Sequence, residues 1–234
     1  MTDAYLLVSH GSRDPRPQAA INQLAAQLNL QLPAPMVATA QLELAVAPLH
    51  VQISDFANRC QVIGIDRILV LPLFLIPGVH VMEDIPAQIA LAEREIGDKV
   101  KLVVTSFLGT NADLINLFAQ NRLSLPSQSI ILAHGSRRPG SNQLVERLAA
   151  QLALQPAYWS IAPSLIDRVA ELTATGATEI GILPYFLFAG GITDAISQSL
   201  AQLRAQYPQV KLTLGEPIGN SPELAATIGK ILGW

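Results

Sequence analysis

The chain contains few of the residues that build covalent frameworks or cysteine-based metal clusters. Its 234 residues include a single cysteine, Cys60, which excludes a disulfide framework and a cysteine-rich zinc site and favours a reducing compartment. Only 14% of the residues are charged and 5% are aromatic, whereas 50% are hydrophobic, so the core must be built mainly from aliphatic side chains. The net charge of −3 argues against nucleic acid as a partner.

Long hydrophobic runs are also missing. No apolar stretch reaches the roughly 18 uninterrupted residues of a membrane-spanning helix. Residues 1–3 lead directly into an apolar, strand-like run, without the basic segment that begins a signal peptide. We therefore expect a cytoplasmic protein without a membrane partner. An organellar form from which a transit peptide has been removed remains the alternative.

Three catalytic or nucleotide-binding motifs are absent. The sequence has no GxxxxGK[ST] loop for a nucleoside triphosphate and no GxGxxG fingerprint for a dinucleotide. It also has no GxSxG turn carrying a nucleophilic serine. These absences predict a chemistry that needs neither a nucleotide nor a covalent serine intermediate.

What the chain does contain is an internal repeat. Residues 6–13 read LLVSHGSR and residues 130–137 read IILAHGSR, at an offset of 124. Residues 71–80 (LPLFLIPGVH) and 183–192 (LPYFLFAGGI) match at an offset of 112. The repeat predicts a tandem duplication with domains at residues 1–123 and 124–234, joined near the Ser- and Pro-containing segment 122–128.

Short apolar runs alternate with amphipathic segments, which is typical of βα units around a parallel sheet. We therefore predict an α/β fold of two similar domains, each with a four-stranded parallel sheet. The expected strands are Tyr5–Ser9, Met36–Leu42, Arg67–Leu73, Lys101–Thr105, Ser129–Ala133, Ala157–Ile161, Glu179–Pro184 and Lys211–Leu214. The expected helices are Pro17–Asn29, Pro48–Cys60, Glu83–Glu95, Asn111–Arg122, Ser141–Leu152, Ser164–Thr175, Thr193–Tyr207 and Pro222–Leu232.

Three strand ends in the first domain carry side chains that can bind a metal or accept a proton. In open α/β sheets, ligands bind beyond the carboxyl ends of the strands. His10 ends the first expected strand, Glu43 ends the second, and His80 follows the third. Two histidines and a carboxylate suit Fe, Co, Ni or Zn, and imidazoles accept protons near neutral pH.

The second domain has lost most of this set. Aligning the two copies places His134 opposite His10, Tyr158 opposite Glu43 and Ile192 opposite His80. One remaining ligand is too few for a metal site. The sequence therefore predicts one working site, in the first domain.

Each candidate also has a structural interpretation when taken alone. A histidine before a glycine can be only a hydrogen-bonded turn residue, and most carboxylates at strand ends are simply solvated. Glu83 and Asp84 could assist metal entry, but such residues more often only favour the start of a helix. His50 has no partner in the pattern and is expected to be structural or exposed.

The two HGSR loops carry Arg13, Arg16, Arg137 and Arg138. Loops that lead into helix N-termini favour anions, and arginine adds bidentate contacts to carboxylates. These four residues are therefore candidate substrate-binding cations. The alternative is that Arg13 pairs locally with Asp14 or Glu83 and the others are solvated.

The motifs HGSRDP (residues 10–15) and LPLFLIPGVHVMEDIP (residues 71–86) resemble those of the sirohydrochlorin chelatases, and the resemblance covers the whole chain. It implies a chelatase-like fold whose two domains face each other across a cleft that holds the tetrapyrrole. The metal-site histidines of the family fall on His10 and His80, and its acidic residue falls on Glu43. The resemblance leaves open a monomer or a homodimer.

The implied reaction is insertion of Fe²⁺ into sirohydrochlorin, which gives sirohaem and releases two protons. His10 and His80 would hold the ion and accept protons, with Glu43 as a further base, and the arginines would bind the substrate carboxylates. No cofactor is expected beyond the divalent metal substrate. A cobaltochelatase that takes Co²⁺ is the nearest alternative, and a carrier of tetrapyrrole or metal without turnover is an alternative of another class. A hydrolase using the HG loop is disfavoured because the nucleophile motif is missing.

Overall fold

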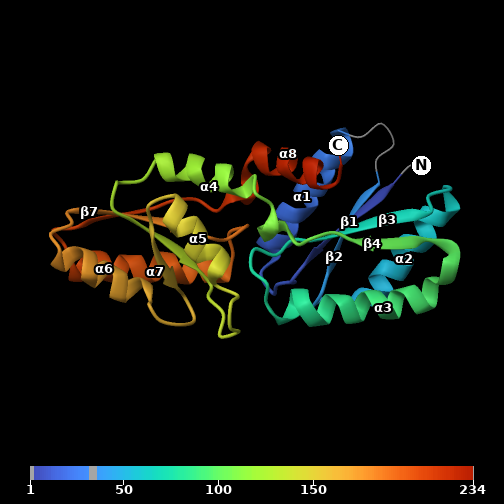
Figure 1. The fold of residues 1–234 in the computed structure, drawn as a ribbon, viewed down its shortest axis with the longest axis horizontal. Helices are drawn as coiled ribbons and strands as arrows, with labels where there is room; N and C mark the ends of the chain where they lie inside the picture. The colour runs from blue at the N-terminus through green and yellow to red at the C-terminus, as the bar shows by residue number, and fades with distance from the viewer. Residues whose placement is uncertain (1–2, 32–35, 234) are drawn as a thin grey trace. The chain divides into compact units, whose positions relative to one another are not determined.

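The computed structural model describes residues 3–31 and 36–233, and these residues contain two four-stranded parallel sheets (Figure 1). The first sheet has the order β2-β1-β3-β4 and the second has the order β6-β5-β7-β8. Their strands are β1 (Ala4–Ser9), β2 (Val37–Gln41), β3 (Arg67–Pro72), β4 (Lys101–Val104), β5 (Ser129–Ala133), β6 (Gln155–Tyr158), β7 (Glu179–Pro184) and β8 (Lys211–Leu214). The predicted α/β class and the pair of four-stranded parallel sheets are confirmed.

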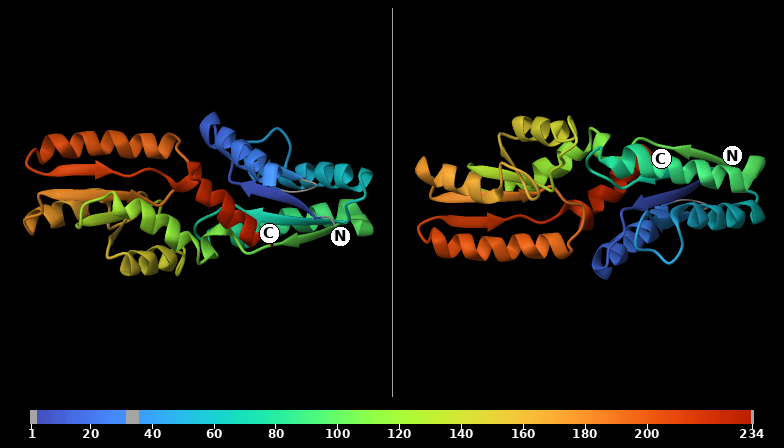
Figure 2. Two further views of the ribbon diagram at one scale, coloured as in Figure 1. Left: turned by 90° about the horizontal axis from the view of Figure 1, so that it is seen from above. Right: turned by 90° about the horizontal axis from the view of Figure 1, so that it is seen from below.

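Helices connect successive strands, as parallel pairing requires, and Figure 2 shows helices on both faces of each sheet. The α-helices are α1 (Pro15–Gln31), α2 (Leu49–Val62), α3 (Ile85–Ile96), α4 (Leu114–Leu123), α5 (Gln143–Gln151), α6 (Leu165–Ala174), α7 (Gly191–Gln206) and α8 (Pro222–Ile231). Four shorter turns complete the path: the π-helical turn η1 (His80–Asp84) and the 3₁₀ turns η2 (Gly97–Lys99), η3 (Leu108–Thr110) and η4 (Ile218–Asn220).

The described residues group into two compact units that exchange helices. One unit comprises Met1–Asn111 with Ala225–Trp234, and the other comprises Ala112–Leu224. Helix α4 follows the first sheet in the chain but belongs to the second unit, whereas most of α8 belongs to the first. The compact units therefore do not coincide with the two expected domains, 1–123 and 124–234. The boundary at residue 123 stays a prediction about where one copy of the repeat ends and the other begins.

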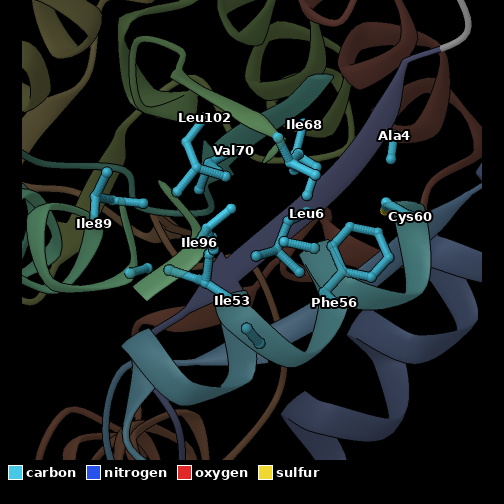
Figure 3. Packing of buried hydrophobic residues seen from close by; sticks show 14 of the residues in the cluster. Ala4, Leu6, Ile53, Phe56, Cys60, Ile68, Val70, Ile89, Ile96 and Leu102 are labelled. Carbon is cyan, nitrogen blue, oxygen red and sulfur yellow. The ribbon is translucent and has the colours of Figure 1, made fainter. Parts of the chain in front are cut away.

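The core of the first unit lies between its sheet and the pair α2 and α3. Strand β1 is buried along its whole length, because helices cover both faces of a parallel sheet. Its Leu6 packs with Phe56 of α2 and with Ile89 of α3 in one apolar cluster (Figure 3). Removing a side chain of this size from water contributes about 1.5–3 kcal/mol, so the cluster holds β1 in a fixed position.

The second unit has an equivalent core. Buried residues of α6 and α7, including Val169 and Leu200, pack against Ile130 and Ile182 of the sheet. Phe118 of α4 stacks on Tyr185 just beyond β7, with ring centroids 4.8 Å apart. This aromatic contact accounts for the membership of α4 in the second unit.

Most expected elements differ from the observed ones by one to three residues at an end. The largest shift is at β6, which runs from Gln155 to Tyr158 rather than from Ala157 to Ile161. It ends early because the chain bends after Tyr158 and leads into α6, where Ser164 forms a capping box with Asp167. None of the helices in the described ranges is long and apolar enough to cross a membrane.

Cys60 gives a direct test of the first core. Burial raises the pKa of its thiol to about 11, so almost no thiolate is present at neutral pH. We expect iodoacetamide to label Cys60 slowly in the native protein and rapidly in urea, as followed by mass spectrometry. Because the folded pKa exceeds the unfolded one, the contribution of this thiol to stability is lost as the pH rises toward about 11. Rapid labelling of the native protein would contradict this packing.

Candidate functional site

The candidate site lies at the topological switch point of the first sheet, where the order in which the chain adds strands reverses. Strands β1 and β3 are neighbours, but the chain passes from β1 to β2 on one side and from β3 to β4 on the other. Loops that leave neighbouring strands in opposite directions open a crevice at the carboxyl ends of those strands. His10 directly follows β1, and His80 begins η1 after β3, so the two histidines flank this switch point.

The structure brings the three predicted residues together. The imidazole rings of His10 and His80 meet edge to face, with centroids 4.5 Å apart and an interplanar angle of 72°. Glu43 Oε2 lies 3.9 Å from His10 Nδ1, and both side chains are 50% exposed. Phe74 lies behind the pair, with its ring centroid 6.3 Å from that of His10 and 6.4 Å from that of His80. The site thus combines two accessible imidazoles, one carboxylate and an aromatic wall.

The three side chains do not form a ready-made metal cage. Within the described ranges, no three His, Cys, Asp or Glu side chains are arranged to hold a metal ion together. Binding an ion at this site therefore requires the exposed side chains to rotate toward it. Their half-exposed positions leave room for that rotation.

The backbone at Gly11 fixes the distance between His10 and Glu43. The amide of Glu43 donates to the carbonyl of His10 at 2.9 Å, which continues the β1–β2 ladder beyond the strand ends. Gly11 has a φ of +95°, and a Cβ at this position would lie 1.9 Å from the carbonyl oxygen of Glu43. Only glycine combines this conformation with so close an approach, which gives the HG motif its physical reason.

His80 has a hydrogen-bonding partner that the sequence did not assign. Its Nδ1 lies 2.7 Å from Oδ2 of Asp84 within η1. The amide of Ile85 donates to the carbonyl of His80, five residues earlier, which is the π-helical pattern. The sequence left Asp84 between metal delivery and helix initiation, and the spacing of four residues on a helix was the signal for a contact.

A depression of about 270 Å³ adjoins the site and is lined in part by Glu43 and Asp84. Large exposed apolar residues are close to the site in the sequence: Leu44 follows Glu43 and is 57% exposed, while Val79 precedes His80 and Met82 comes two residues after it, and both are about half exposed. Leu44 has a φ of +60°, an uncommon conformation for a residue other than glycine. The chain next to Glu43 and His80 therefore exposes apolar side chains to solvent.

The second unit repeats the backbone of the site but not its chemistry. The amide of Ser160 donates to the carbonyl of His134 at 2.9 Å, as that of Glu43 does to His10. Ser160 therefore occupies the position of Glu43, and the expected match with Tyr158 is wrong, because the β1–β2 register pairs Ser9 with Gln41 whereas β5–β6 pairs Ala133 with Tyr158. Tyr158 is instead a core residue whose pKa is raised by burial.

The arginines of the two loops differ in their contacts. Arg16 forms a bidentate ion pair with Asp14 and lowers the pKa of that carboxyl, so the alternative pairing of Arg13 with Asp14 is wrong. Arg13 and Arg137 are exposed, and neither has a hydrogen bond or ion pair within the described ranges. Arg137 and Arg138 line a depression of about 330 Å³ beside α5.

His50 has the structural role expected for it. Its Nδ1 lies 2.9 Å from Oε1 of Gln88, and its Nε2 lies 3.6 Å from Oε1 of Glu95. These contacts tie α2 to α3 in the part of the molecule that carries the site. His50 therefore has a structural role between these two helices.

The fold and the site together define a class: a duplicated open α/β protein with a histidine and carboxylate site at the switch point of one copy. The comparisons identify the family. The CbiX family model matches residues 4–124 and again residues 128–232, so the chain belongs to the CbiX family. This confirms the resemblance inferred from the HGSRDP and GVHVMEDIP motifs.

Named relatives cover most of the chain. A sirohydrochlorin cobaltochelatase of Priestia megaterium is 24% identical over 240 residues, covering 94% of this chain and 76% of the relative. A sirohydrochlorin ferrochelatase of the same species is 24% identical over 223 residues, covering 88% and 81%. The structure of SirB from Bacillus subtilis with Fe³⁺ superposes with a TM-score of 0.83 at 21% identity, covering 99% of this chain and 94% of that one, which establishes the shared fold.

We expect Gly11→Ala to destabilise the protein more than Gly64→Ala. Both glycines have positive φ, but a Cβ at Gly64 meets nothing within 4 Å, whereas a Cβ at Gly11 overlaps the carbonyl of Glu43. A positive φ alone should lower the free energy of unfolding of either alanine variant by about 1 kcal/mol. The steric overlap should bring the decrease for Gly11→Ala to about 3 kcal/mol. Urea unfolding measures both variants. Equal losses would contradict the close approach of the HG loop to Glu43.

Proposed function

We propose that the protein is a sirohydrochlorin chelatase that inserts Fe²⁺ into sirohydrochlorin, giving sirohaem with release of two protons. The observation that supports this most is the convergence of His10, His80 and Glu43 at one strand edge, with the imidazole centroids 4.5 Å apart. The names of the CbiX-family relatives point to the same substrate. The reaction needs no nucleotide and no cofactor beyond the metal that it consumes.

The chemistry requires a place for the ion and acceptors for two protons. Two inner nitrogens of the free macrocycle carry protons that must leave as the metal forms its bonds. Neutral imidazoles bind Fe²⁺ through nitrogen and also accept protons near neutral pH. In the proposed mechanism His10 and His80 hold the ion, and each ring can accept a proton only after the ion has passed from it to the macrocycle; Glu43 acts as a further base beside His10.

The surroundings suit a large, partly apolar ring. The exposed Leu44, Val79 and Met82 offer an apolar surface beside the polar groups. Exposed apolar patches on soluble proteins commonly mark binding sites. Binding energy gained at the ring periphery can be used to distort the macrocycle so that its nitrogens become accessible to the ion.

The carboxylates of the substrate need cationic partners, and Arg13 is the first candidate in the unit that carries the site. It is exposed, makes no ion pair within the described ranges and lies three residues after His10. Arg16 is engaged with Asp14, so it is a weaker candidate. Arg137 and Arg138 of the second loop stay predictions, as does the choice between a monomer and a homodimer.

Cobalt insertion is the second candidate, because the relatives divide between cobaltochelatases and ferrochelatases. A donor set of two imidazoles and a carboxylate accepts both Fe²⁺ and Co²⁺. Kinetic measurements distinguish a ferrochelatase or a cobaltochelatase from a carrier that has no turnover. A carrier binds sirohydrochlorin stoichiometrically and does not accelerate insertion of either metal.

We expect His10→Ala and His80→Ala each to lower the rate of metal insertion by about 100-fold or more, the typical contribution of an acid–base group. His134→Ala is the matched control, since it removes the corresponding histidine of the second copy and should leave most of the rate. The assay is anaerobic incubation with sirohydrochlorin and either Fe²⁺ or Co²⁺, followed by visible absorption. An equal loss in His134→Ala would contradict a single site, and no rate with either metal would contradict the enzyme.

Arg13→Gln should raise the KM for sirohydrochlorin severalfold with little change in kcat, because it removes a contact made equally in the ground state and the transition state. Arg94→Gln, an exposed arginine near the end of α3, serves as the control for the loss of one positive charge. Steady-state kinetics at low and high salt measure both variants. Unchanged kinetics in Arg13→Gln would remove this residue from substrate binding.

A further inference from the structure

The segment that carries His80 is one residue longer than its counterpart in the second copy. Strands β3 and β7 both end in Leu-Pro, at Pro72 and at Pro184. The first buried residue of the following helix is Ile85 in α3, 13 positions later, and Ile196 in α7, 12 positions later. The first copy thus holds one extra residue between the strand and the helix.

The buried positions of the two helices then coincide. In α3 they are Ile85, Ile89 and Ala92, and in α7 they are Ile196, Leu200 and Leu203, with the same intervals of four and three residues. The two helices therefore face their sheets in the same register. Whatever accommodates the extra residue must lie before Ile85.

The π-helical turn η1 accommodates it. A π turn closes its hydrogen bond over five residues instead of four, and the bond from the Ile85 amide to the His80 carbonyl has this form. Helix α7 is α-helical from Gly191 onward. The extra residue is therefore taken up within His80–Asp84, at the site itself.

The π turn occurs in the same copy as the hydrogen-bonded pair of His80 and Asp84. Within η1, Asp84 Oδ2 lies 2.7 Å from His80 Nδ1. In the second copy the residue aligned with His80 is Ile192, and the residue before the first buried position is Ala195 in place of Asp84. The copy without the π turn thus has no imidazole at the position of His80 and no carboxylate at the position of Asp84, although Asp194 lies one residue earlier.

We propose that η1 is a functional insertion that positions His80 through Asp84. An ionised carboxylate only accepts hydrogen bonds, so its contact with Nδ1 places the ring proton there and leaves the lone pair on Nε2. The Nε2 atom is then the one that binds the metal or accepts a proton. Asp84 is a positioning residue, since it acts through His80, and its part in metal insertion rests on the proposed function.

The contact contributes little to stability, because the side chains of His80 and Asp84 are 33% and 45% exposed and exposed pairs are worth little. Its effect should appear in the orientation of the ring and in metal affinity. Carboxylates that orient a metal-binding histidine typically change affinity or activity by about 10- to 100-fold. This separates a positioning role from a role in holding the fold together.

The first test compares Asp84→Leu with Asp84→Asn, whose amide oxygen can still accept from Nδ1. ¹⁵N NMR of the His80 ring at about pH 8.5, well above the ordinary histidine pKa, should show Nδ1–H in the wild type and in Asp84→Asn. In Asp84→Leu the ring should shift toward the Nε2–H form. Cobalt affinity without tetrapyrrole, measured by titration, should fall about 10- to 100-fold in Asp84→Leu and be largely retained in Asp84→Asn. Glu93→Gln, an exposed carboxylate on α3, is the control and should change neither readout.

The second test deletes Met82, an exposed residue of η1, and gives the segment the length found before α7. The variant keeps His80, Asp84 and the buried positions of α3, so circular dichroism and Tm should stay near those of the wild type. Cobalt affinity without tetrapyrrole, which does not depend on the apolar contact of Met82 with the macrocycle, should fall at least as far as in Asp84→Leu. If the deletion fails to fold, the ring tautomer in Asp84→Leu decides the question.

The outcomes separate the two proposals. An unchanged His80 tautomer and unchanged cobalt affinity in Asp84→Leu would overturn the positioning role, whatever the enzyme activity. Unchanged cobalt affinity in the Met82 deletion would overturn the functional role of the π turn. If the tautomer and affinity respond as expected but the wild type inserts no metal, the positioning stands and the chelatase assignment fails.

Discussion

Parallel pairing of β1 with both β2 and β3 is the constraint on which the site depends. A parallel sheet brings the carboxyl ends of neighbouring strands to one edge, and the buried β1 holds that edge in a fixed position between two layers of helices. His10, Glu43 and His80 follow three neighbouring strands and are separated by long stretches of sequence. Without this pairing the three side chains would not meet. The hydrogen bond from the Glu43 amide to the His10 carbonyl continues the β1–β2 pairing beyond the ends of the two strands.

The duplicated halves show which features belong to the scaffold and which to the chemistry. Gly109 in the first unit and Gly219 in the second both donate a backbone hydrogen bond to the carbonyl of the loop after the third strand, and a Cβ at either position would overlap that loop. Such contacts occur in both copies because they shape the strand ends. The carboxylate after the second strand and the histidine after the third occur in one copy alone, so the same backbone is present with and without the full set of candidate residues.

The sequence predicted the sheets and the position of the site because both depend on local patterns. Buried parallel strands are continuous apolar runs, and chemically active residues at their ends are visible as motifs. It missed Ser160 because the offset between the copies changes along the chain, and only backbone pairing revealed the true counterpart of Glu43. It missed η1 for a similar reason, since one extra residue does not disturb the apolar period of α3. The helix exchange was also invisible, because the sequence of a helix such as α4 does not indicate which sheet it will cover.

That exchange has a consequence for the order in which the protein is made. The first unit contains β1, β2 and β3 and hence the whole candidate site, yet it also includes Ala225–Trp234. Chains emerge from the ribosome starting with the N-terminus, and domains commonly fold as they emerge. Here the first unit must wait for residues that follow the whole second unit in the chain, whereas the second unit already has all of its residues by Leu224. The unit that carries His10, Glu43 and His80 is therefore completed after the second unit, so a chain truncated after Leu224 would contain these three residues without the finished unit around them.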